Sequence, residues 1–194
     1  SLLTGDIEAK WTQGMITTAN ARRLWQLLPV SLQTLVEIAP DLLDSFISAN
    51  LLATRAAVLS IAQAAWLERL EYLLEQRKKG ASNPDLAQSD LFEQYTQFLG
   101  TLTKDRPLLL VVDDAQWADV ASINLLFHLG RRLAGNHILL VVTYRPDEVA
   151  MGRPSLNSGQ VERHPLEPVI NELKRTHGDI WIDLTSTTDR RFID

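Results

Sequence analysis

Acidic, hydroxyl and basic side chains that could bind a cation and a phosphate follow two apolar runs of the chain. Asp113 and Asp114 come directly after the first run, and the second run is followed by Thr143 and, two residues later, Arg145. Adjacent carboxylates suit a hard cation such as Mg²⁺, held through its waters, together with a base or water-orienting group. An arginine beside them suits a phosphate that gains negative charge during transfer. These residue types therefore indicate metal-assisted chemistry on a phosphate.

The two apolar runs, 108–112 and 138–142, predict neighbouring parallel strands. Each holds five large apolar residues and ends at polar ones, which is typical of a strand buried on both faces. The segment between them predicts a helix that Asp119 can cap and Gly135 can end. A strand, a helix and a strand in this order almost always form a right-handed parallel crossover. The polar residues then meet at the carboxyl ends of the strands, where open α/β sheets bind ligands.

The same segments resemble the AAA-like ATPase domains of large bacterial signalling proteins, the signal-transduction (STAND-type) branch of the P-loop NTPases. The resemblance is carried by five apolar residues, the string Asp-Asp-x-x-Trp-x-Asp over 113–119, a helix, and a strand that ends in Thr-Tyr-Arg at 143–145. It implies a three-layer α/β fold with a parallel sheet, incomplete here, and a helix-rich N-terminal part. It also makes 108–114 the Walker B strand.

The resemblance further implies ATP and Mg²⁺ as cofactors and a role for each polar residue. Asp113 would hold the Mg²⁺ shell through water, and Asp114 would orient or activate the attacking water. Arg145 matches the polar sensor position at the end of the next strand, and Thr143 is the weaker candidate for it. Trp117 belongs to the family's recurrent sequence but receives no chemical step.

One motif of the P-loop NTPases is missing. The sequence contains no Gly-x-x-x-x-Gly-Lys-Ser/Thr, and none of its lysines follows a glycine. The backbone cradle and the lysine that grip the nucleotide phosphates are therefore absent. Because that loop lies well upstream of Walker B in the family, we expect the chain to be an interior fragment. Its parent would be an ATPase, and the fragment alone would be inactive.

Composition excludes several classes of function. The chain of 194 residues is 45% hydrophobic and 22% charged, which is ordinary for a soluble globular protein. Its net charge of −5 gives no electrostatic case for binding nucleic acid. The absence of cysteine excludes disulfides and thiol chemistry, and fits a cytoplasmic protein. No apolar stretch approaches the roughly 20 residues that a membrane helix needs.

The chain divides by pattern into a helical subdomain or insertion over 1–88 and an NTPase core fragment over 89–194. The expected helices of the first part span 17–28, 31–39, 41–48 and 49–79, with the first ending before Pro29. In the second part, the pattern predicts a helix from Ser89 or Asp90, a mobile loop over 151–168, a short helix over 169–176, a third strand over 180–184 and a further helix from Thr187 or Thr188.

Other interpretations of the same residues stay open. Arg145 could pair with Asp147 or Glu148 as a loop salt bridge. The chain could also be a helical protein-interaction module on a degenerate ATPase scaffold. A phosphorelay receiver, which also opens with paired aspartates, is rejected because the second strand ends without an aspartate.

The resemblance also sets the expected partners. It implies nucleotide, other domains of the same polypeptide and a role in bacterial signal transduction or transcriptional regulation, with oligomerisation left open. In sheets of this type the P-loop strand lies between the sensor strand and the last strand. Without it, 180–184 would lose its neighbour, and we expect an exposed sheet edge and a tendency to associate.

Overall fold

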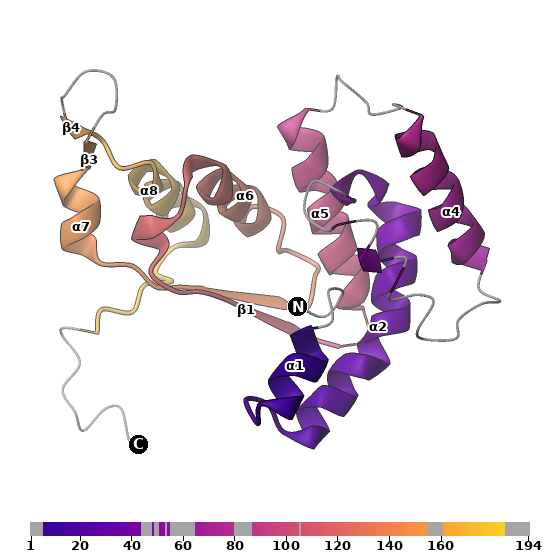
Figure 1. Cartoon of the computed structure of the whole chain (residues 1–194). Helices are drawn as coiled ribbons and strands as arrows, with labels where there is room; N and C mark the ends of the chain where they lie inside the picture. Colours follow the sequence, from indigo (N-terminus) through magenta and orange to yellow (C-terminus); the bar gives the residue numbers. More distant parts are fainter. Residues whose placement is uncertain are drawn as a thin grey trace. The chain divides into compact units, whose positions relative to one another are not determined.

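The computed structural model describes residues 6–43, 48, 51–52, 54, 65–79, 87–104, 106–154 and 161–184. The chain divides into two compact units, Ser1–Leu108 with Gly135–Ile138, and Leu109–Ala134 with Leu139–Asp194 (Figure 1). The first unit is helical and the second is α/β. The helix that precedes the first strand packs within the helical unit, while the assignment of 1–88 as an insertion stays a prediction.

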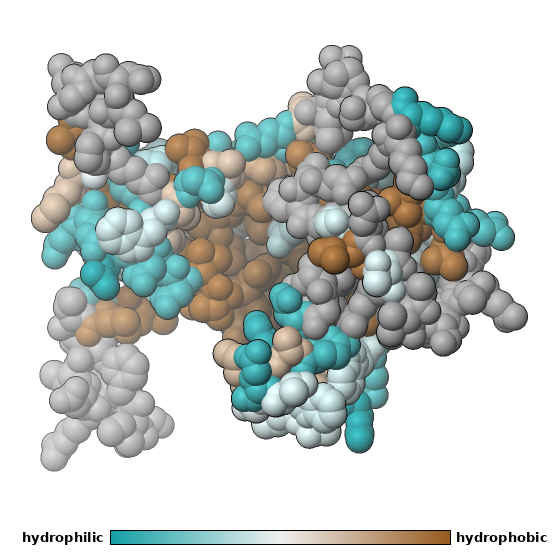
Figure 2. Space-filling view, viewed as in Figure 1, coloured by the Kyte–Doolittle hydropathy of each residue, from teal (hydrophilic) through white to brown (hydrophobic). Residues whose placement is uncertain are grey.

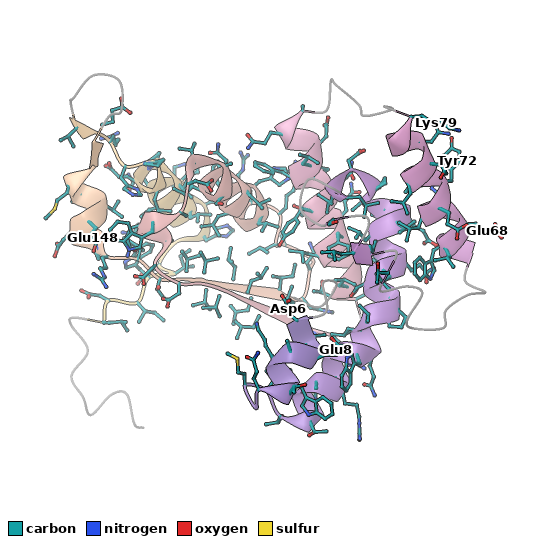
Figure 3. The ribbon with its side chains drawn as sticks, in the orientation of Figure 1. Asp6, Glu8, Glu68, Tyr72, Lys79 and Glu148 are labelled. Carbon is teal, nitrogen blue, oxygen red and sulfur yellow. The ribbon has the colours of Figure 1, made fainter. Side chains whose placement is uncertain are left out.

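The helical unit is built around one long helix. Its elements are α1 (Asp6–Thr12), α2 (Thr18–Ile38), the 3₁₀ helix η1 (Pro40–Leu42), α4 (Ala65–Lys78) and α5 (Gln88–Leu102). Thr17 caps α2, its side chain accepting from the Asn20 N–H at 3.2 Å. The α2 helix contacts α1, α4 and α5. In Figure 3, Glu8 lies on α1, and its carboxylate accepts from Trp25 Nε1 at 3.0 Å.

The expected end of the first helix before Pro29 is wrong. Helix α2 continues through Pro29 to Ile38, so two expected helices form one. Proline removes one backbone donor and disfavours a helix interior. The helix persists because its apolar face is fully buried, with Leu28 and Leu32 both at 0% exposure. Ser31, where the second helix was expected to begin, lies inside α2 and donates to the Leu27 carbonyl at 2.8 Å.

The helices expected after α2 are described only in part. The one expected over 41–48 is a 3₁₀ turn, Pro40–Leu42, and residues 44–47 lie outside the described part. Helix α4 covers the C-terminal half of the helix expected over 49–79, whose residues 55–64 also lie outside it. Helix α5 begins at Gln88, one residue before the expected start.

The α/β unit confirms the expected strand, helix and strand. Its elements are β1 (Leu108–Val112), η2 (Ala115–Trp117), α6 (Val120–Gly130), β2 (Ile138–Val142), α7 (Pro146–Met151), β3 (Arg153–Pro154), β4 (Val161–Glu162) and α8 (Leu166–His177). The β1–β2 pair is parallel, because the Leu108 N–H donates to His137 O at 2.8 Å and the Thr143 N–H donates to Val112 O at 2.9 Å. The carboxyl ends of both strands therefore lie side by side.

Helix α6 begins as the sequence predicts and ends earlier than expected. Asp119 caps it, accepting from the Ser122 N–H at 2.7 Å. The helix ends at Gly130, and Gly135, with φ of 83°, lies in the turn before β2. A left-handed backbone favours glycine, so Gly135 shapes the turn between elements and not the helix end.

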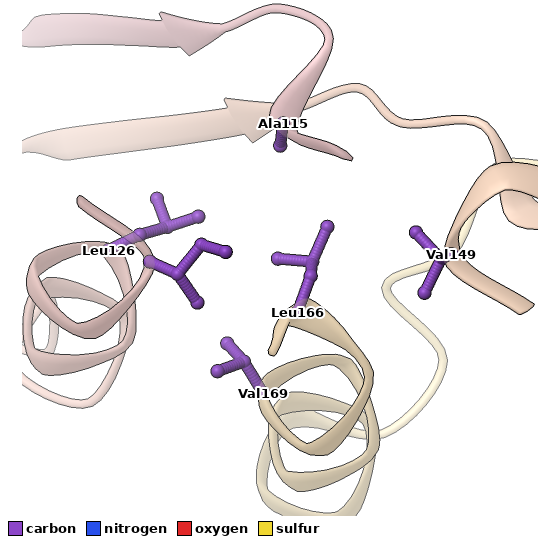
Figure 4. Packing of buried hydrophobic residues seen from close by; sticks show 6 residues of the cluster. Ala115, Leu126, Val149, Leu166 and Val169 are labelled. Carbon is purple, nitrogen blue, oxygen red and sulfur yellow. The ribbon is translucent and has the colours of Figure 1, made fainter. Parts of the chain in front are cut away.

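Only one face of the β1–β2 pair is covered, so the expected burial on both faces is wrong. The covered face packs on a cluster of six buried residues from η2, α6, α7 and α8, namely Ala115, Ile123, Leu126, Val149, Leu166 and Val169 (Figure 4). On the other face, Leu109, Val111 and Leu139 are 60%, 57% and 63% exposed. Figure 2 shows apolar residues gathered in the centre of the view, around α6 and β1. No described element of the α/β unit covers this exposed face of the pair.

The C-terminal part differs from the expected loop, helix and strand. The segment expected as a loop over 151–168 contains the antiparallel pair β3–β4 and the start of α8, with residues 155–160 outside the described part. The third strand expected over 180–184 is wrong, because no described strand pairs with this segment. Trp181 instead packs edge-on against Tyr144, with ring centroids 5.1 Å apart. The helix expected from Thr187 or Thr188 lies outside the described residues.

Among the described helices, none is long and apolar enough to cross a membrane.

Candidate functional site

Asp113 and Thr143 lie together at the carboxyl ends of the two parallel strands. The Thr143 hydroxyl donates to Asp113 Oδ1 and accepts from the Asp114 N–H at 3.0 Å. The Thr143 carbonyl accepts from the Ala115 N–H at 2.9 Å. A hydroxyl has one proton to donate and two lone pairs, so Thr143 can make both contacts at once. The end of β2 thereby fixes the acidic end of β1.

Asp114 turns the chain out of the strand. Its backbone has φ of 53° and ψ of 45°, the left-handed region, and it is the one non-glycine residue with positive φ among those described. Aspartate tolerates this region better than most residues. Its carbonyl accepts from the Trp117 N–H at 2.9 Å, which starts η2. The turn places the second carboxylate apart from the first, on the side of Gln116 and Arg145.

Arg145 forms one of the two loop contacts that the sequence left open, the one with Glu148, and it also approaches Asp114. Its Nη1 donates to Glu148 Oε1 at 3.0 Å, and its Nε lies 3.9 Å from Asp114 Oδ1. Glu148 projects from α7 in Figure 3. The Arg145 side chain is 66% exposed. Exposed ion pairs contribute about 1 kcal/mol or less, so neither contact prevents the guanidinium from turning to a phosphate.

Two buried polar residues at this site were not singled out from the sequence. Gln116 is 3% exposed and His164 is 2% exposed. Gln116 Nε2 donates to Asp114 Oδ1 at 2.8 Å, and His164 Nε2 donates to the Gln116 carbonyl at 3.0 Å. Gln116 occupies an unspecified position of the Asp-Asp-x-x-Trp-x-Asp string. His164 lies 48 residues further along the chain, and only the fold brings it there.

Trp117 in the Asp-Asp-x-x-Trp-x-Asp string and Tyr144 after β2 receive no role in the chemistry of the site. Trp117 is 73% exposed, and nothing in the described structure explains its presence. Tyr144, between the two site residues of β2's end, packs on Trp181. Burial raises the pKa of the Tyr144 phenol above its ordinary value, so the ring stays neutral at physiological pH.

The donor set fits a hard cation bound mainly through water. The strand ends offer carboxylate and hydroxyl oxygens, which are the ligands that Mg²⁺ prefers. Among the described residues there is no group of three or more acidic, histidine or cysteine side chains that could form a protein cage. Mg²⁺ keeps several waters and uses one or two carboxylates together with substrate phosphates. Asp113, oriented by Thr143, fits that mode of binding.

A parallel strand pair with acids at its carboxyl end, in a helix-rich α/β chain, is compatible with a P-loop NTPase-like fold. Comparison with protein families matches residues 7–142 to the AAA ATPase domain, which is more than half of the chain. The chain belongs to the AAA ATPase domain family. No curated protein and no solved structure matches it. The match ends at Val142, the last residue of β2, so Thr143 and Arg145 lie directly after it.

Proposed function

We propose that this chain is the cation- and water-facing part of an ATP-binding and ATP-hydrolysing switch domain. The observation that carries the proposal is the pairing of Asp113 and Thr143 at the ends of adjacent parallel strands, with Asp114 next in the chain. Membership of the AAA ATPase domain family supports it, because this family generally uses ATP and Mg²⁺.

Each side chain has a role that its chemistry allows. Mg²⁺, when bound, would neutralise charge on the phosphate oxygens. Asp113 would accept hydrogen bonds from the waters of the cation, and the Thr143 hydroxyl would keep that carboxylate in place. Asp114 would accept a proton or a hydrogen bond from the attacking water. Arg145 would leave Glu148 to contact the phosphate.

The sequence has no glycine-rich loop with its lysine, so no part of it matches the motif that binds nucleotide phosphates in P-loop NTPases. We therefore propose that this segment supplies Walker B and the sensor, and that nucleotide binding needs a phosphate-binding loop outside it. The STAND-type role, in which nucleotide state switches other domains of one polypeptide in a bacterial regulator, is part of this proposal. Its support is the Asp-Asp-x-x-Trp-x-Asp string followed by Thr-Tyr-Arg.

A metal titration followed by nuclear magnetic resonance tests the proposed cation site. Mn²⁺, which replaces Mg²⁺ and broadens nearby signals, should first broaden the signals from the ends of β1 and β2. In Asp113→Asn this broadening should need at least about tenfold more metal, the loss that even an outer-shell partner of a metal site causes. The measurement is line width against Mn²⁺ concentration.

The matched control is Asp147→Asn, the same substitution at an exposed carboxylate of α7. It should leave the titration unchanged. Broadening that Asp113→Asn does not alter, or that Asp147→Asn reduces equally, would indicate a diffuse acidic surface. The non-catalytic scaffold would then be the better account.

A further inference from the structure

We propose that Gln116 is a positioning residue for the Asp114 carboxylate and that His164 fixes Gln116. The inference rests on the proposed function, because the orientation of Asp114 matters for hydrolysis only if this is an ATPase site. It assigns work to two buried polar side chains that the resemblance leaves without a role.

Both ends of the Gln116 amide are used. Nε2 donates to Asp114 Oδ1 at 2.8 Å, and Oε1 accepts from the Arg145 N–H at 3.2 Å. Only the nitrogen can donate to a carboxylate and only the oxygen can accept from a backbone N–H, so the partners determine the orientation of the amide. Gln116 is 3% exposed, and a buried amide is costly unless it is hydrogen-bonded. The side chain therefore has one favourable arrangement.

His164 determines where the backbone of Gln116 lies. Its Nε2 faces the Gln116 carbonyl at 3.0 Å, and its Nδ1 accepts from the Leu166 N–H at 3.1 Å. These partners require the neutral tautomer with the proton on Nε2. Leu166 is the first residue of α8. The start of α8 is thus linked through two buried side chains to the second acid.

The contacts of the Asp114 carboxylate all involve one of its two oxygens, Oδ1. Both Gln116 and Arg145 approach Oδ1, at 2.8 Å and 3.9 Å. Within the described part of the chain, Oδ2 accepts no hydrogen bond. Because the Asp114 side chain is 52% exposed, without a donor it would sample several rotamers. Gln116 would hold it in one rotamer, with Oδ2 available to a water.

The direct test measures the χ1 rotamer of Asp114 by scalar couplings in the isotope-labelled chain. In the wild type we expect one rotamer. Gln116→Glu keeps the shape and the acceptor for the Arg145 N–H but replaces the donor with a second carboxylate. It should give averaged couplings at Asp114. Gln97→Glu is the matched control, since Gln97 Nε2 donates to Glu93 Oε1 at 3.3 Å at an exposed position of α5.

Two variants of His164 separate its two contacts. Glutamine places an amide nitrogen near the position of Nε2, so His164→Gln should keep the bond to the Gln116 carbonyl and the single Asp114 rotamer. Asparagine places an acceptor near the position of Nδ1, so His164→Asn should keep only the bond from the Leu166 N–H. It should give averaged couplings at Asp114, although both variants fill the same buried site.

A single Asp114 rotamer in folded Gln116→Glu would overturn the inference. If that variant does not fold, a measurement on the wild type still tests whether the Gln116 amide is fixed. The Gln116 side-chain amide protons should exchange slowly with solvent, and exchange as fast as at Gln97 would contradict a fixed amide. Neither readout needs nucleotide or metal. The two claims can therefore fail separately. If the Asp114 couplings are averaged in Gln116→Glu but Asp113→Asn leaves the Mn²⁺ titration unchanged, the proposed function is refuted and the positioning role of Gln116 is retained.

Discussion

At the scale of single residues, Thr143 does more than the sequence suggested. The resemblance makes it the weaker candidate for the sensor, yet its hydroxyl contacts the Asp113 carboxylate and the Asp114 N–H together. Arg145, which reaches Glu148 and Asp114 from an exposed position, remains the group that could respond to a phosphate. We therefore interpret Thr143 as the residue that orders the acids and Arg145 as the candidate sensor.

Replacing Thr143 with valine keeps the shape of the side chain and removes both hydrogen bonds. We expect Thr143→Val to lower the free energy of unfolding by about 1 kcal/mol, the net value of a typical hydrogen bond, because the site is exposed. Thr143→Ser keeps the hydroxyl, so it should lower the free energy of unfolding by only a small part of that amount. Chemical denaturation of both variants measures the difference, and equal stability would show that the hydroxyl does not hold the acids.

The four predicted site residues could be brought together from the sequence because one rule suffices. Parallel strands joined by a helix place their carboxyl ends side by side, so Asp113, Asp114, Thr143 and Arg145 had to converge. His164 could not be found in this way. Its contact with Gln116 depends on how the β3–β4 pair and the start of α8 return to the strand ends, and no local spacing encodes that path.

At the scale of elements, two glycines end helices in the same way but in different surroundings. Gly152 follows α7 with φ of 74°, and Gly178 follows α8 with φ of 73°. A Cβ at Gly152 would clash with the Glu162 carbonyl oxygen of β4, whereas no atom of the described residues lies within 4 Å of one at Gly178. The first glycine is therefore required by both conformation and space, and the second by conformation alone.

Alanine at these positions separates the two costs. Gly178→Ala should destabilise the chain by about 1–3 kcal/mol, because a positive φ with an extended ψ is a backbone region that essentially only glycine adopts. Gly152→Ala should cost about 1–3 kcal/mol more, because the backbone of β4 must move. Hydrogen exchange should show the additional loss at β3 and β4. Equal destabilisation by the two variants would mean that the β3–β4 pair does not form as described.

Elements were predictable where local pattern and tertiary packing agree, and not where they conflict. Pro29 marks a helix end by its local chemistry, but the buried leucines of α2 outweigh it. The segment 180–184 has residue types that favour a strand, but a strand also needs a hydrogen-bonding neighbour, and none of the described strands provides one. Sequence pattern shows what a segment can form, and the neighbours decide whether it does.

At the scale of the whole molecule, one face of the β1–β2 pair presents apolar side chains that no described element of the α/β unit covers. Leu109, Val111 and Leu139 project from one face of β1 and β2 with more than half of each side chain exposed. Contiguous apolar surface of this kind promotes association. The segment 180–184, whose edge was expected to be exposed, is not a strand, so the apolar surface that could promote association is this face of β1 and β2.

We expect the chain to self-associate with rising concentration. Val111→Lys should weaken this association by about tenfold or more, because an ammonium group on the exposed face would have to be desolvated. Val30→Lys is the control, since Val30 is 51% exposed on α2, close to the 57% of Val111. Sedimentation velocity measures both variants. A wild type that stays monomeric over the whole concentration range would contradict the expectation.

The central claim is that this sequence carries the cation- and water-facing half of an ATPase site and not the half that grips phosphates. A calorimetric titration of the chain with ATP, with and without Mg²⁺, tests it most directly. The claim predicts no measurable binding in either condition, because the glycine-rich loop is absent from the sequence. Clear Mg²⁺-dependent binding that is lost in Asp113→Ala would contradict it, and would mean that the described strand ends belong to a complete nucleotide site.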